Sequence, residues 1–321
     1  MRKTIYLLLL CGCICGCRES DTGRTLKLAH GLNTDHPVHL GMVRMGELLA
    51  ARSEGSLQLE IYPNQQLGTE RQCLELIQMG SLGMTKVSGA TIENFVPRIK
   101  VLGLPYVFRD REHAYRVFDG PIGRQLLTEG ESSYLRGLTY FDAGQRSFYT
   151  KERPVREPGD LSGLKIRTMQ SPVAMDMVRA FGGSPTPISW GELYTALQQG
   201  VVDGAENNPP SFYTSRHYEI CKYYSLNEHT AVPDLLIIGT HVWNQLSAQE
   251  QTWLQRAANE AATYQRELWR AAEQEALDAV AAAGVEIIRP DKSRFRERAQ
   301  TVLDAFRGQP EYELIQQIQQ Q

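Results

Sequence analysis

The feature that most constrains the fold is a stretch of about 36 residues without Pro or Gly, which begins after Ser247 and ends at Gly284. Ser247 and Glu250 form the capping-box pattern that starts a helix, and Gly284 supplies the left-handed residue that ends one. At 1.5 Å per residue this helix would be roughly 54 Å long, which exceeds one small lobe. Its apolar residues keep no Leu/Ile heptad, which argues against a coiled coil. The sequence therefore predicts a helix that spans two lobes. After it we expect a strand at 285–288, a helix around 292–306 and a frayed tail at 316–321.

The N-terminus has the pattern of a secretory signal. A short basic start is followed by an apolar run at residues 5–10, which is too short to cross a bilayer. The string that ends at Cys17 resembles a bacterial lipobox, and the string that ends at Cys13 fits almost as well. Because a polar tether directly follows Cys17, we expect residues 1–17 to be a signal peptide with a lipobox-like end, and lipidation at Cys17.

Four cysteines at alternate positions of this leader could instead form a metal cluster. Their C-x-C-x-C-x-C spacing, with no histidine nearby, suits zinc poorly, so no metal site is expected. One acylated cysteine would anchor a protein to a membrane without spanning it. We expect a periplasmic location, with a lipid anchor as the only contact with the membrane.

Beyond the leader, the composition indicates a soluble protein held together by apolar cores. Only Cys73 and Cys221 remain, and the sequence leaves open whether they form a disulfide. The net charge of −3 and the lack of a basic tract argue against nucleic acid as a partner. No other segment approaches about 18 apolar residues, the length of a membrane-spanning helix. The roughly 300 residues after the leader suffice for two lobes of ordinary size.

The first part of the mature chain predicts a parallel βαβ unit. Residues 26–30 and 57–62 alternate as strands do, and between them apolar residues recur at helical spacing over about residues 37–53. The segment between the strands leaves no room for a hairpin. A helix that connects two strands favours a parallel pair, and with it an α/β fold.

Two later units, residues 69–88 and 189–206, resemble each other weakly. In each, a capping-box pattern begins a helix, Gly80 or Gly200 ends it, and a strand follows. Any α/β protein can show such units. Their separation of about 120 residues nevertheless suggests two lobes of like construction.

No familiar catalytic motif occurs in the chain. The seven His are scattered, and none has the H-E-x-x-H spacing of a metal site. The sequence lacks a G-x-S-x-G elbow, a P-loop and a G-x-G-x-x-G turn. These observations favour a binding protein over an enzyme, and no cofactor is expected.

Four motifs stand in an order that identifies a family resemblance. They are residues 66–68 (QLG), 160–167 (DLSGLKIR), 190–200 (WGELYTALQQG) and 202–207 (VDGAEN). Together they resemble the solute-binding proteins of tripartite ATP-independent periplasmic (TRAP) transporters, the DctP family, over about residues 25–305. The partners implied are an organic acid ligand and the membrane subunits of a TRAP transporter.

The resemblance also implies the architecture. Family members are type II-like periplasmic binding proteins, in which two α/β lobes joined by crossing strands close on the ligand and a long helix spans both lobes. We expect lobe I to comprise residues 25–143 and 233–262, and lobe II to comprise residues 144–232 and 263–305.

The ligand-binding residues of lobe II follow from the same motifs. Arg167 matches the arginine that holds the ligand carboxylate in this family, and a guanidinium suits that role because its two parallel donors match two carboxylate oxygens. Arg146 matches a second arginine that faces the ligand. Asn207 matches an asparagine of the family, and Trp190 matches an aromatic residue on which the ligand ring rests.

Lobe I is expected to decide which acid binds. Glu70, Lys86, Ser88 and His30 supply hydrogen-bonding groups suited to several hydroxyls, and His36 lies in a segment that adds contacts near the cleft. A keto acid or fatty acid would leave such groups unpaired, at about 1–3 kcal/mol each. The strings at residues 84–88, 206–213 and 223–229 look like the subgroup that binds hexuronates such as glucuronate and galacturonate.

Three alternatives stay open at this point. The ligand could be another organic acid, such as a C4-dicarboxylate or sialic acid. The chain could be a ligand-sensing subunit that docks on a membrane receptor. It could also be a secreted enzyme, a lyase or an esterase, that acts on a sugar acid.

Overall fold

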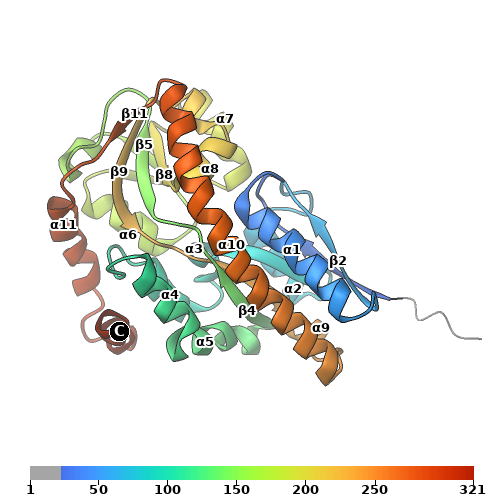
Figure 1. Cartoon of the computed structure of the whole chain (residues 1–321). Coiled ribbons are helices and arrows are strands. Elements are labelled where there is room, and N and C mark those ends of the chain that lie inside the picture. Colours follow the sequence, from blue (N-terminus) through green and yellow to red (C-terminus); the bar gives the residue numbers. More distant parts are fainter. Residues whose placement is uncertain (1–22) are drawn as a thin grey trace, which may run out of the picture.

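The computed structural model describes residues 23–321, and these form two β-sheets surrounded by helices (Figure 1). The predicted signal peptide at residues 1–17 and the lipidation at Cys17 lie outside the described residues. Within the described residues, no helix is both long enough and apolar enough to cross a bilayer. The sequence prediction of a two-lobe α/β fold is confirmed.

The first sheet has five strands in the order β2-β1-β3-β10-β4. Strands β1 and β2 are parallel and are connected by helix α1, which confirms the predicted βαβ unit. Strand β10 arrives from late in the chain and pairs antiparallel with both β3 and β4. The bounds are Arg24–Ala29 (β1), Pro37–Arg52 (α1), Leu57–Tyr62 (β2), Met84–Ser88 (β3), Leu135–Phe141 (β4) and Asp234–Gly239 (β10).

The second sheet has six strands in the order β11-β9-β5-β8-β6-β7. Strand β6 is parallel to β7 and β8, whereas β5 pairs antiparallel with β8 and β9. The bounds are Arg146–Thr150 (β5), Lys165–Thr168 (β6), Ser184–Pro187 (β7), Gly204–Asn207 (β8), Tyr223–Thr230 (β9) and Glu286–Ile288 (β11).

The two helix–Gly–strand units occupy corresponding places in the two sheets. Helix α2 (Glu70–Gln78) leads into β3, and helix α7 (Leu193–Gln198) leads into β8. Gly80 and Gly200 have φ of +79° and +73°, a left-handed conformation that glycine adopts without a steric penalty. The similarity noticed in the sequence therefore corresponds to equivalent units of the two lobes.

The predicted capping boxes differ in outcome. Thr69 caps α2, because its hydroxyl accepts from the backbone N–H of Gln72, whose side chain accepts in return from the N–H of Thr69. The prediction at Ser189 is wrong. The chain there enters a 3-10 turn, Trp190–Glu192, and the Ser189 hydroxyl bonds the Glu192 carboxylate instead of the backbone.

The long helix α10, Ala248–Ala282, spans both lobes as predicted (Figure 1). Its first part packs on α1, where Ala258 and Ala261 are fully buried, and its last part packs near α8 (Pro209–Thr214), where Val280 is buried in the second lobe. At its centre, the Gln265 side chain donates to the carbonyl of Asp142 at 2.8 Å and accepts from the Asp142 N–H at 2.8 Å. Residues 142–145 run from β4 of the first sheet to β5 of the second, so the helix supports a segment that crosses between the lobes.

This crossing segment passes very close to α10. Gly144 has φ of +59°, and a Cβ at this position would lie 2.6 Å from Nε1 of Trp269 on α10. Only glycine fits such an approach without displacement of the indole. The chain crosses back at residues 231–233, immediately before β10.

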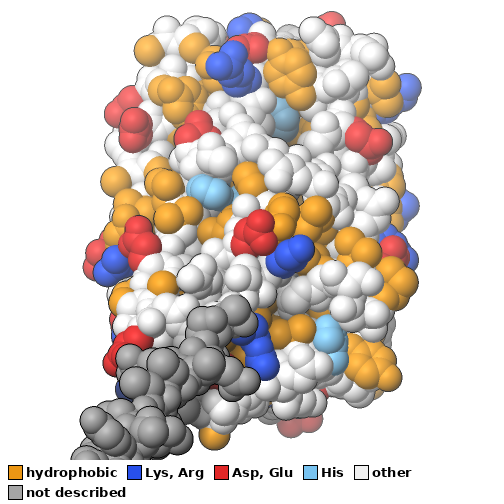
Figure 2. Space-filling view, turned by 90° about the vertical axis from the view of Figure 1, so that its right-hand side faces the viewer, with side chains coloured by type: hydrophobic (Ala, Val, Ile, Leu, Met, Phe, Trp, Pro, Cys, Tyr) orange, Lys and Arg blue, Asp and Glu red, His pale blue; other side chains and the backbone are white. Residues whose placement is uncertain are grey.

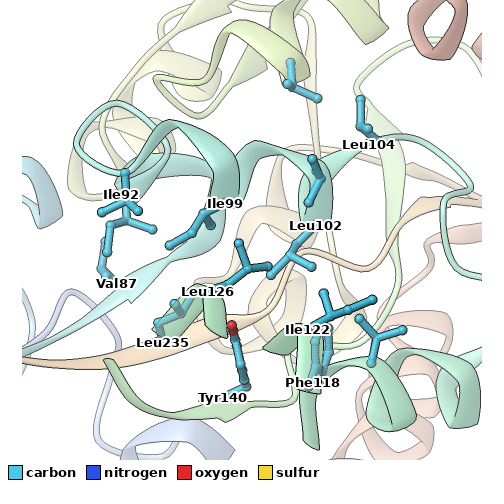
Figure 3. Close-up of a cluster of buried hydrophobic side chains, with 14 of the residues drawn as sticks. Val87, Ile92, Ile99, Leu102, Leu104, Phe118, Ile122, Leu126, Tyr140 and Leu235 are labelled. Carbon is cyan, nitrogen blue, oxygen red and sulfur yellow. The ribbon is translucent and has the colours of Figure 1, made fainter. Parts of the chain in front are cut away.

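Both faces of the first sheet are buried. On β10, Leu235 and Ile237 point into one apolar cluster, and Leu236 and Ile238 point into another. Figure 3 shows the first cluster, in which Leu235 lies near Leu126 and Val87 lies near Ile92. The covering elements include α3 (Gly89–Ile92), a 3-10 helix (Pro97–Gly103), α4 (Arg111–Asp119) and α5 (Pro121–Thr128).

The C-terminal tail is ordered, so the expectation of fraying at 316–321 is wrong. Helix α12, Glu311–Gln320, follows α11 (Lys292–Asp304) and buries Leu314, Ile315 and Ile318 in the first-lobe cluster. His113 Nε2 lies 2.8 Å from the Ile318 carbonyl. The polar Gln-rich end concealed an apolar stripe at positions i, i+1 and i+4, which is the face that packs.

The two cysteines of the mature chain are free and buried. Cys73 lies in the first-lobe cluster around α2, and Cys221 lies in a second-lobe cluster beside Tyr224. The question left open by the sequence is thereby answered for the described residues: these thiols belong to different cores and do not form a disulfide.

The lobes contact each other directly through polar groups. Ser171, the N-cap of α6 (Pro172–Ala180) in the second lobe, donates to Oε1 of Glu93 in the first lobe at 2.7 Å. Asn33 Nδ2 donates to the carbonyl of Thr214 at 2.7 Å, again from the first lobe to the second. The other carboxylate oxygen of Glu93, Oε2, is buried without a hydrogen-bond partner. These hydrogen bonds bridge the lobes, and the Glu93 carboxylate that accepts one of them is incompletely satisfied.

Replacement of Glu93 by Gln should make the protein more stable at neutral and alkaline pH. Burial raises the pKa of Glu93 from 4.5 to about 7, and the Ser171 hydrogen bond offsets this only in part. The cost of an ionised Glu93 is absent below pH 4.5, grows between pH 4.5 and 7, and is at most about 3 kcal/mol above that range. Thermal unfolding should show a higher Tm for E93Q than for the wild type at pH 8, with a difference that fades toward pH 4.5.

The matched control is Glu152→Gln at an exposed position of the second lobe, which should leave the Tm difference near zero at every pH. An E93Q variant that is less stable than the wild type at pH 8 would contradict this account of Glu93.

Candidate ligand-binding site

A cavity lies between the two lobes and receives residues from both. It encloses about 790 Å³, its open mouth included. Arg167 lies within β6, Arg146 begins β5 and Asn207 ends β8, so the second sheet presents these three side chains together. The first lobe contributes Glu70, at the start of α2, and the charged residue Lys86 of β3. The remaining lining residues are Gly31, Leu32, Gln65, Thr69, Arg71, Ser88, Thr91, Ala143, Met169, Gln170, Ile188, Ser189, Trp190, Asn208, Ser211, Val232 and Asp234.

Arg167 is a buried cation without a counter-ion. Arg167 is 3% exposed, and its Nε donates a hydrogen bond to the Ile188 carbonyl at 2.9 Å. Among the described residues, no carboxylate lies within 4.0 Å of its guanidinium nitrogens. Burial lowers the pKa of Arg167, and the charge of Arg146 acts in the same direction. Because an arginine remains ionised even so, the site holds an unbalanced positive charge.

Arg146, by contrast, is already neutralised. Its Nε lies 2.5 Å from one oxygen of Glu206 and its Nη2 lies 2.9 Å from the other, while Nη1 donates to Asn207 Oδ1 at 2.7 Å. Burial opposes the charge on Glu206, but Arg146 and His229 hold its pKa at about 2. Arg146 lines the cavity as expected, yet most of its donors are taken by its own lobe.

The orientation of the Asn207 amide is fixed by its neighbours. Its Oδ1 accepts from Arg146 and also from the N–H of Asn208 at 2.9 Å, and both partners are donors. Asn207 lines the cavity, and among the described residues no protein group accepts a hydrogen bond from its Nδ2. Asn207 can therefore donate a hydrogen bond to a ligand.

Trp190 lines the cavity beside Arg167. The Arg167 guanidinium carbon lies 5.8 Å from the centroid of the indole, within the range of a cation–π contact. Trp190 is partly buried against apolar clusters of both lobes. It therefore presents a flat apolar surface next to the unbalanced cation.

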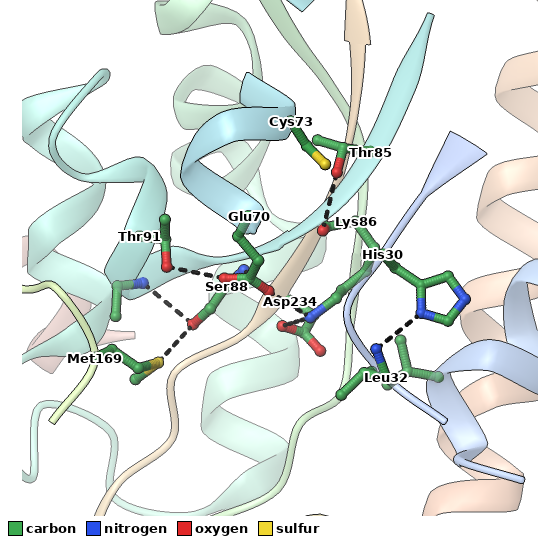
Figure 4. Close-up of polar contacts among 12 residues, drawn as sticks. His30, Leu32, Glu70, Cys73, Thr85, Lys86, Ser88, Thr91, Met169 and Asp234 are labelled. Atoms are coloured by element: carbon green, nitrogen blue, oxygen red, sulfur yellow. Dashed lines mark hydrogen bonds and ion pairs between the residues drawn. The ribbon is translucent and has the colours of Figure 1, made fainter. Parts of the chain in front are cut away.

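The first-lobe wall is built around Lys86, which lies between two acids (Figure 4). Its Nζ is 2.7 Å from Glu70 Oε1 and 3.1 Å from Asp234 Oδ1. Glu70 also accepts from the N–H of Ser88 at 3.2 Å and from the Thr91 hydroxyl at 2.8 Å. With Lys86 protonated and both acids ionised, this wall carries one net negative charge.

The pKa shifts follow from these contacts. Burial opposes ionisation of Glu70, but Lys86 and the other donors lower its pKa overall. Burial also acts on Asp234, and together with the charge of Glu70 it raises the pKa despite Lys86. The pKa of Lys86 is raised by the two carboxylates, against the effect of burial. Lys86 is therefore a firmly charged centre of the wall.

His30 and His36 lie behind the cavity rather than on its lining. His30 Nε2 is 2.9 Å from His39 Nδ1, and its Nδ1 accepts from the N–H of Leu32 at 3.1 Å. Burial, with further contributions from Lys86 and neighbouring histidines, lowers the pKa of His30 to about 2 and that of His36 to about 3. Ser88 does line the cavity, but its hydroxyl contacts Met169 Sδ at 3.3 Å and caps the N–H of Ala90.

The sequence reasoning missed Asp234, Gln65 and Met169, which also line the cavity. A signal for Asp234 was present, because it is a single acid at the start of an otherwise apolar buried strand, and Lys86 is the single charged residue of another buried strand. A charged residue in such a strand needs a partner or a ligand. Gln65 and Met169 lie in loops and carry no comparable signal.

The sequence matches the family model of bacterial extracellular solute-binding protein family 7 (DctP) over residues 28–309. A crystal structure of a TRAP periplasmic solute-binding protein from Bradyrhizobium sp. BTAi1, in complex with α/β-D-galacturonate, is 39% identical and covers 93% of this chain and 100% of its own, with a TM-score of 0.90. The corresponding protein from Pseudomonas putida F1, with bound D-glucuronate, is 34% identical over 92% of this chain and 96% of its own, with a TM-score of 0.89.

A curated relative, the 2,3-diketo-L-gulonate-binding periplasmic protein YiaO of Escherichia coli K12, is 30% identical over 288 residues, 90% of this chain and 88% of that protein. The DctP family consists of periplasmic solute-binding proteins. With a family match over residues 28–309 and structural agreement over 93% of its length, this chain belongs to the DctP family of TRAP solute-binding proteins.

Proposed function

We propose that this protein captures a hexuronate, such as glucuronate or galacturonate, in the periplasm and delivers it to the membrane subunits of a TRAP transporter. The observation that carries the proposal is the unpaired, buried guanidinium of Arg167 in the inter-lobe cavity. The hexuronates bound to the Bradyrhizobium and Pseudomonas proteins support the choice of ligand. The face in Figure 2 mixes acidic and basic side chains and has no continuous basic patch of the kind that binds nucleic acid.

The proposed pose follows from the charges of the two walls. The ligand carboxylate pairs with the two Nη groups of Arg167, as a planar anion does with a planar fork of donors. The sugar ring rests on Trp190, and Asn207 Nδ2 donates to a ring or hydroxyl oxygen. Hydroxyls at the far end meet the polar wall of Glu70, Lys86 and Ser88.

The remaining predicted site residues have supporting roles in this proposal. Arg146 orients Asn207 and adds one donor, while His30 and His36 stabilise the wall from behind. His36, in the first lobe, also contacts the second lobe, because its Nε2 lies 3.1 Å from the Ser211 hydroxyl. Cys17 is the residue that would carry a lipid anchor.

The lining favours a polyhydroxy acid over a C4-dicarboxylate. A short diacid has too few hydroxyls to satisfy Asn207 and the first-lobe wall, and each buried group left unpaired costs about 1–3 kcal/mol. The polar groups are instead matched by several hydroxyls and one carboxylate. A hexuronate provides this combination.

A binding role rather than catalysis is supported by the geometry of the Ser–His contact at the cavity. His36 Nδ1 accepts from the N–H of Val38 at 3.2 Å, which makes Nε2 the protonated nitrogen of a neutral imidazole. His36 therefore donates to the Ser211 hydroxyl and cannot accept its proton. A serine without a base is a poor nucleophile.

Glucuronate or galacturonate should raise the Tm of the mature protein, and Arg167→Met should remove this shift. Met keeps an unbranched apolar stem but has neither the charge nor the guanidinium donors, so the carboxylate loses its partner. Differential scanning fluorimetry with and without the uronate measures the effect, with Arg179→Met on the exposed face of α6 as the control that keeps the shift. A full ligand-induced shift in R167M would contradict the assigned role of Arg167.

The two arginines should respond in opposite ways when no ligand is present. Arg146→Met leaves Glu206 buried without its partner, which should destabilise the protein by about 3–5 kcal/mol. Arg167→Met removes an unbalanced charge and should leave stability unchanged or higher. Urea unfolding of both ligand-free variants tests this contrast, and equal destabilisation of the two would contradict it.

A bound hexuronate should be recovered chemically unchanged. After overnight incubation with the protein, chromatography and mass spectrometry should detect the uronate alone at its original amount. Conversion to an unsaturated or hydrolysed product would indicate a secreted enzyme instead.

A further inference from the structure

The two walls of the cavity carry opposite charge. The second-lobe wall holds the unbalanced cation Arg167, since Arg146 is neutralised by Glu206. The first-lobe wall holds Lys86 between Glu70 and Asp234 and is negative by one charge. A ligand that closes the two lobes together must therefore present an anionic end to one wall and a neutral or cationic end to the other.

We infer that the first-lobe wall excludes a second carboxylate, so that the protein binds sugar acids with one carboxylate and rejects the corresponding aldaric diacids, and that Asp234 sets this discrimination. The inference rests on the proposed function, since it assumes that Arg167 takes the first carboxylate. The inference extends that function to the other end of the ligand and gives Asp234, which has no role in the proposed pose, a role in selection.

Asp234 is distinguished from Glu70 by its free oxygen. Both oxygens of Glu70 are occupied, one by Lys86 and the N–H of Ser88 and the other by Thr91. Asp234 uses only Oδ1 toward Lys86, and within residues 23–321 its Oδ2 has no protein donor. Asp234 is 7% exposed and lines the cavity.

A free carboxylate oxygen in this position distinguishes two kinds of ligand. It can accept a hydrogen bond from a sugar hydroxyl, which strengthens binding of a polyhydroxy monoacid. It repels a second carboxylate at short range, because Lys86 is shared between two acids and cannot neutralise both. Such repulsion weakens binding on the order of tenfold. Arg71, the remaining charged residue of the first lobe at the lining, is paired with Glu75 at 3.0 Å.

The test compares two acyclic acids that share a carbon chain and the configuration of C2–C5. D-Galactonate ends in CH₂OH and galactarate ends in a second carboxylate, so charge at the far end is the main difference. Isothermal titration calorimetry at pH 7.5 should give a Kd for galactonate at least about tenfold lower than that for galactarate. D-Galacturonate is titrated alongside, as the test of the proposed function.

The variant Asp234→Asn should narrow the galactarate-to-galactonate Kd ratio at least about fivefold, because it removes the repulsive charge. Glu70→Gln, on the other side of Lys86, should shift the ratio in the same direction. Asp278→Asn on the exposed face of α10 is the control and should leave the ratio unchanged. Circular dichroism and Tm establish that each variant is folded.

Galactarate that binds the wild type as tightly as galactonate, or a ratio unaffected in D234N, would overturn the inference. Failure of both linear acids to bind while galacturonate binds would also overturn it, because ring shape would then decide selection. Failure of galacturonate to bind would instead refute the proposed function, and the ratio for the linear acids would still decide the role of Asp234.

Discussion

The arrangement of this protein depends on one buried guanidinium, that of Arg167, which has no counter-ion among residues 23–321. Arg167 is held by a single backbone contact and lies beside Arg146, so its charge is unfavourable until an anion arrives. Burial of such a charge is tolerated because the surrounding sheet is packed on both faces, with Phe148 and Tyr149 of β5 in separate apolar clusters. The fold therefore keeps an unpaired positive charge buried at a cost in free energy, and a bound carboxylate can neutralise it.

The two-lobe architecture converts this local imbalance into a condition for closure. Each wall alone is incomplete: one holds an unbalanced cation and the other a net negative charge around Lys86. The helix α10 packs on both lobes and lies close to the crossing segment at Gly144, so it connects the lobes along one side. A ligand that matches both walls stabilises the closed arrangement, whereas one that matches a single wall does not.

Much of the fold could be predicted from the sequence, because it follows from local patterns. The long helix, the βαβ unit and the capping box at Thr69 depend on residues close together in the chain, and the structure has all three. The ordered C-terminal helix was not predicted, because its stability comes from distant partners such as His113. The failed cap at Ser189 likewise reflects a 3-10 turn, which its four-residue pattern does not distinguish from an α-helix.

For the site, the sequence predicted several residues that line the cavity but not how their charges are balanced. Motifs pointed to Arg167, Arg146, Asn207 and Trp190, and the structure brings these residues to one cavity. The difference in charge balance between the two arginines depends on Glu206, and neither spacing nor composition reveals such a pairing.

The most direct test of the account is a crystal structure of the protein with a bound hexuronate. It should have both Nη atoms of Arg167 within hydrogen-bonding distance of the ligand carboxylate. A carboxylate that faces the Lys86 wall or open solvent, with Arg167 unbound, would contradict it.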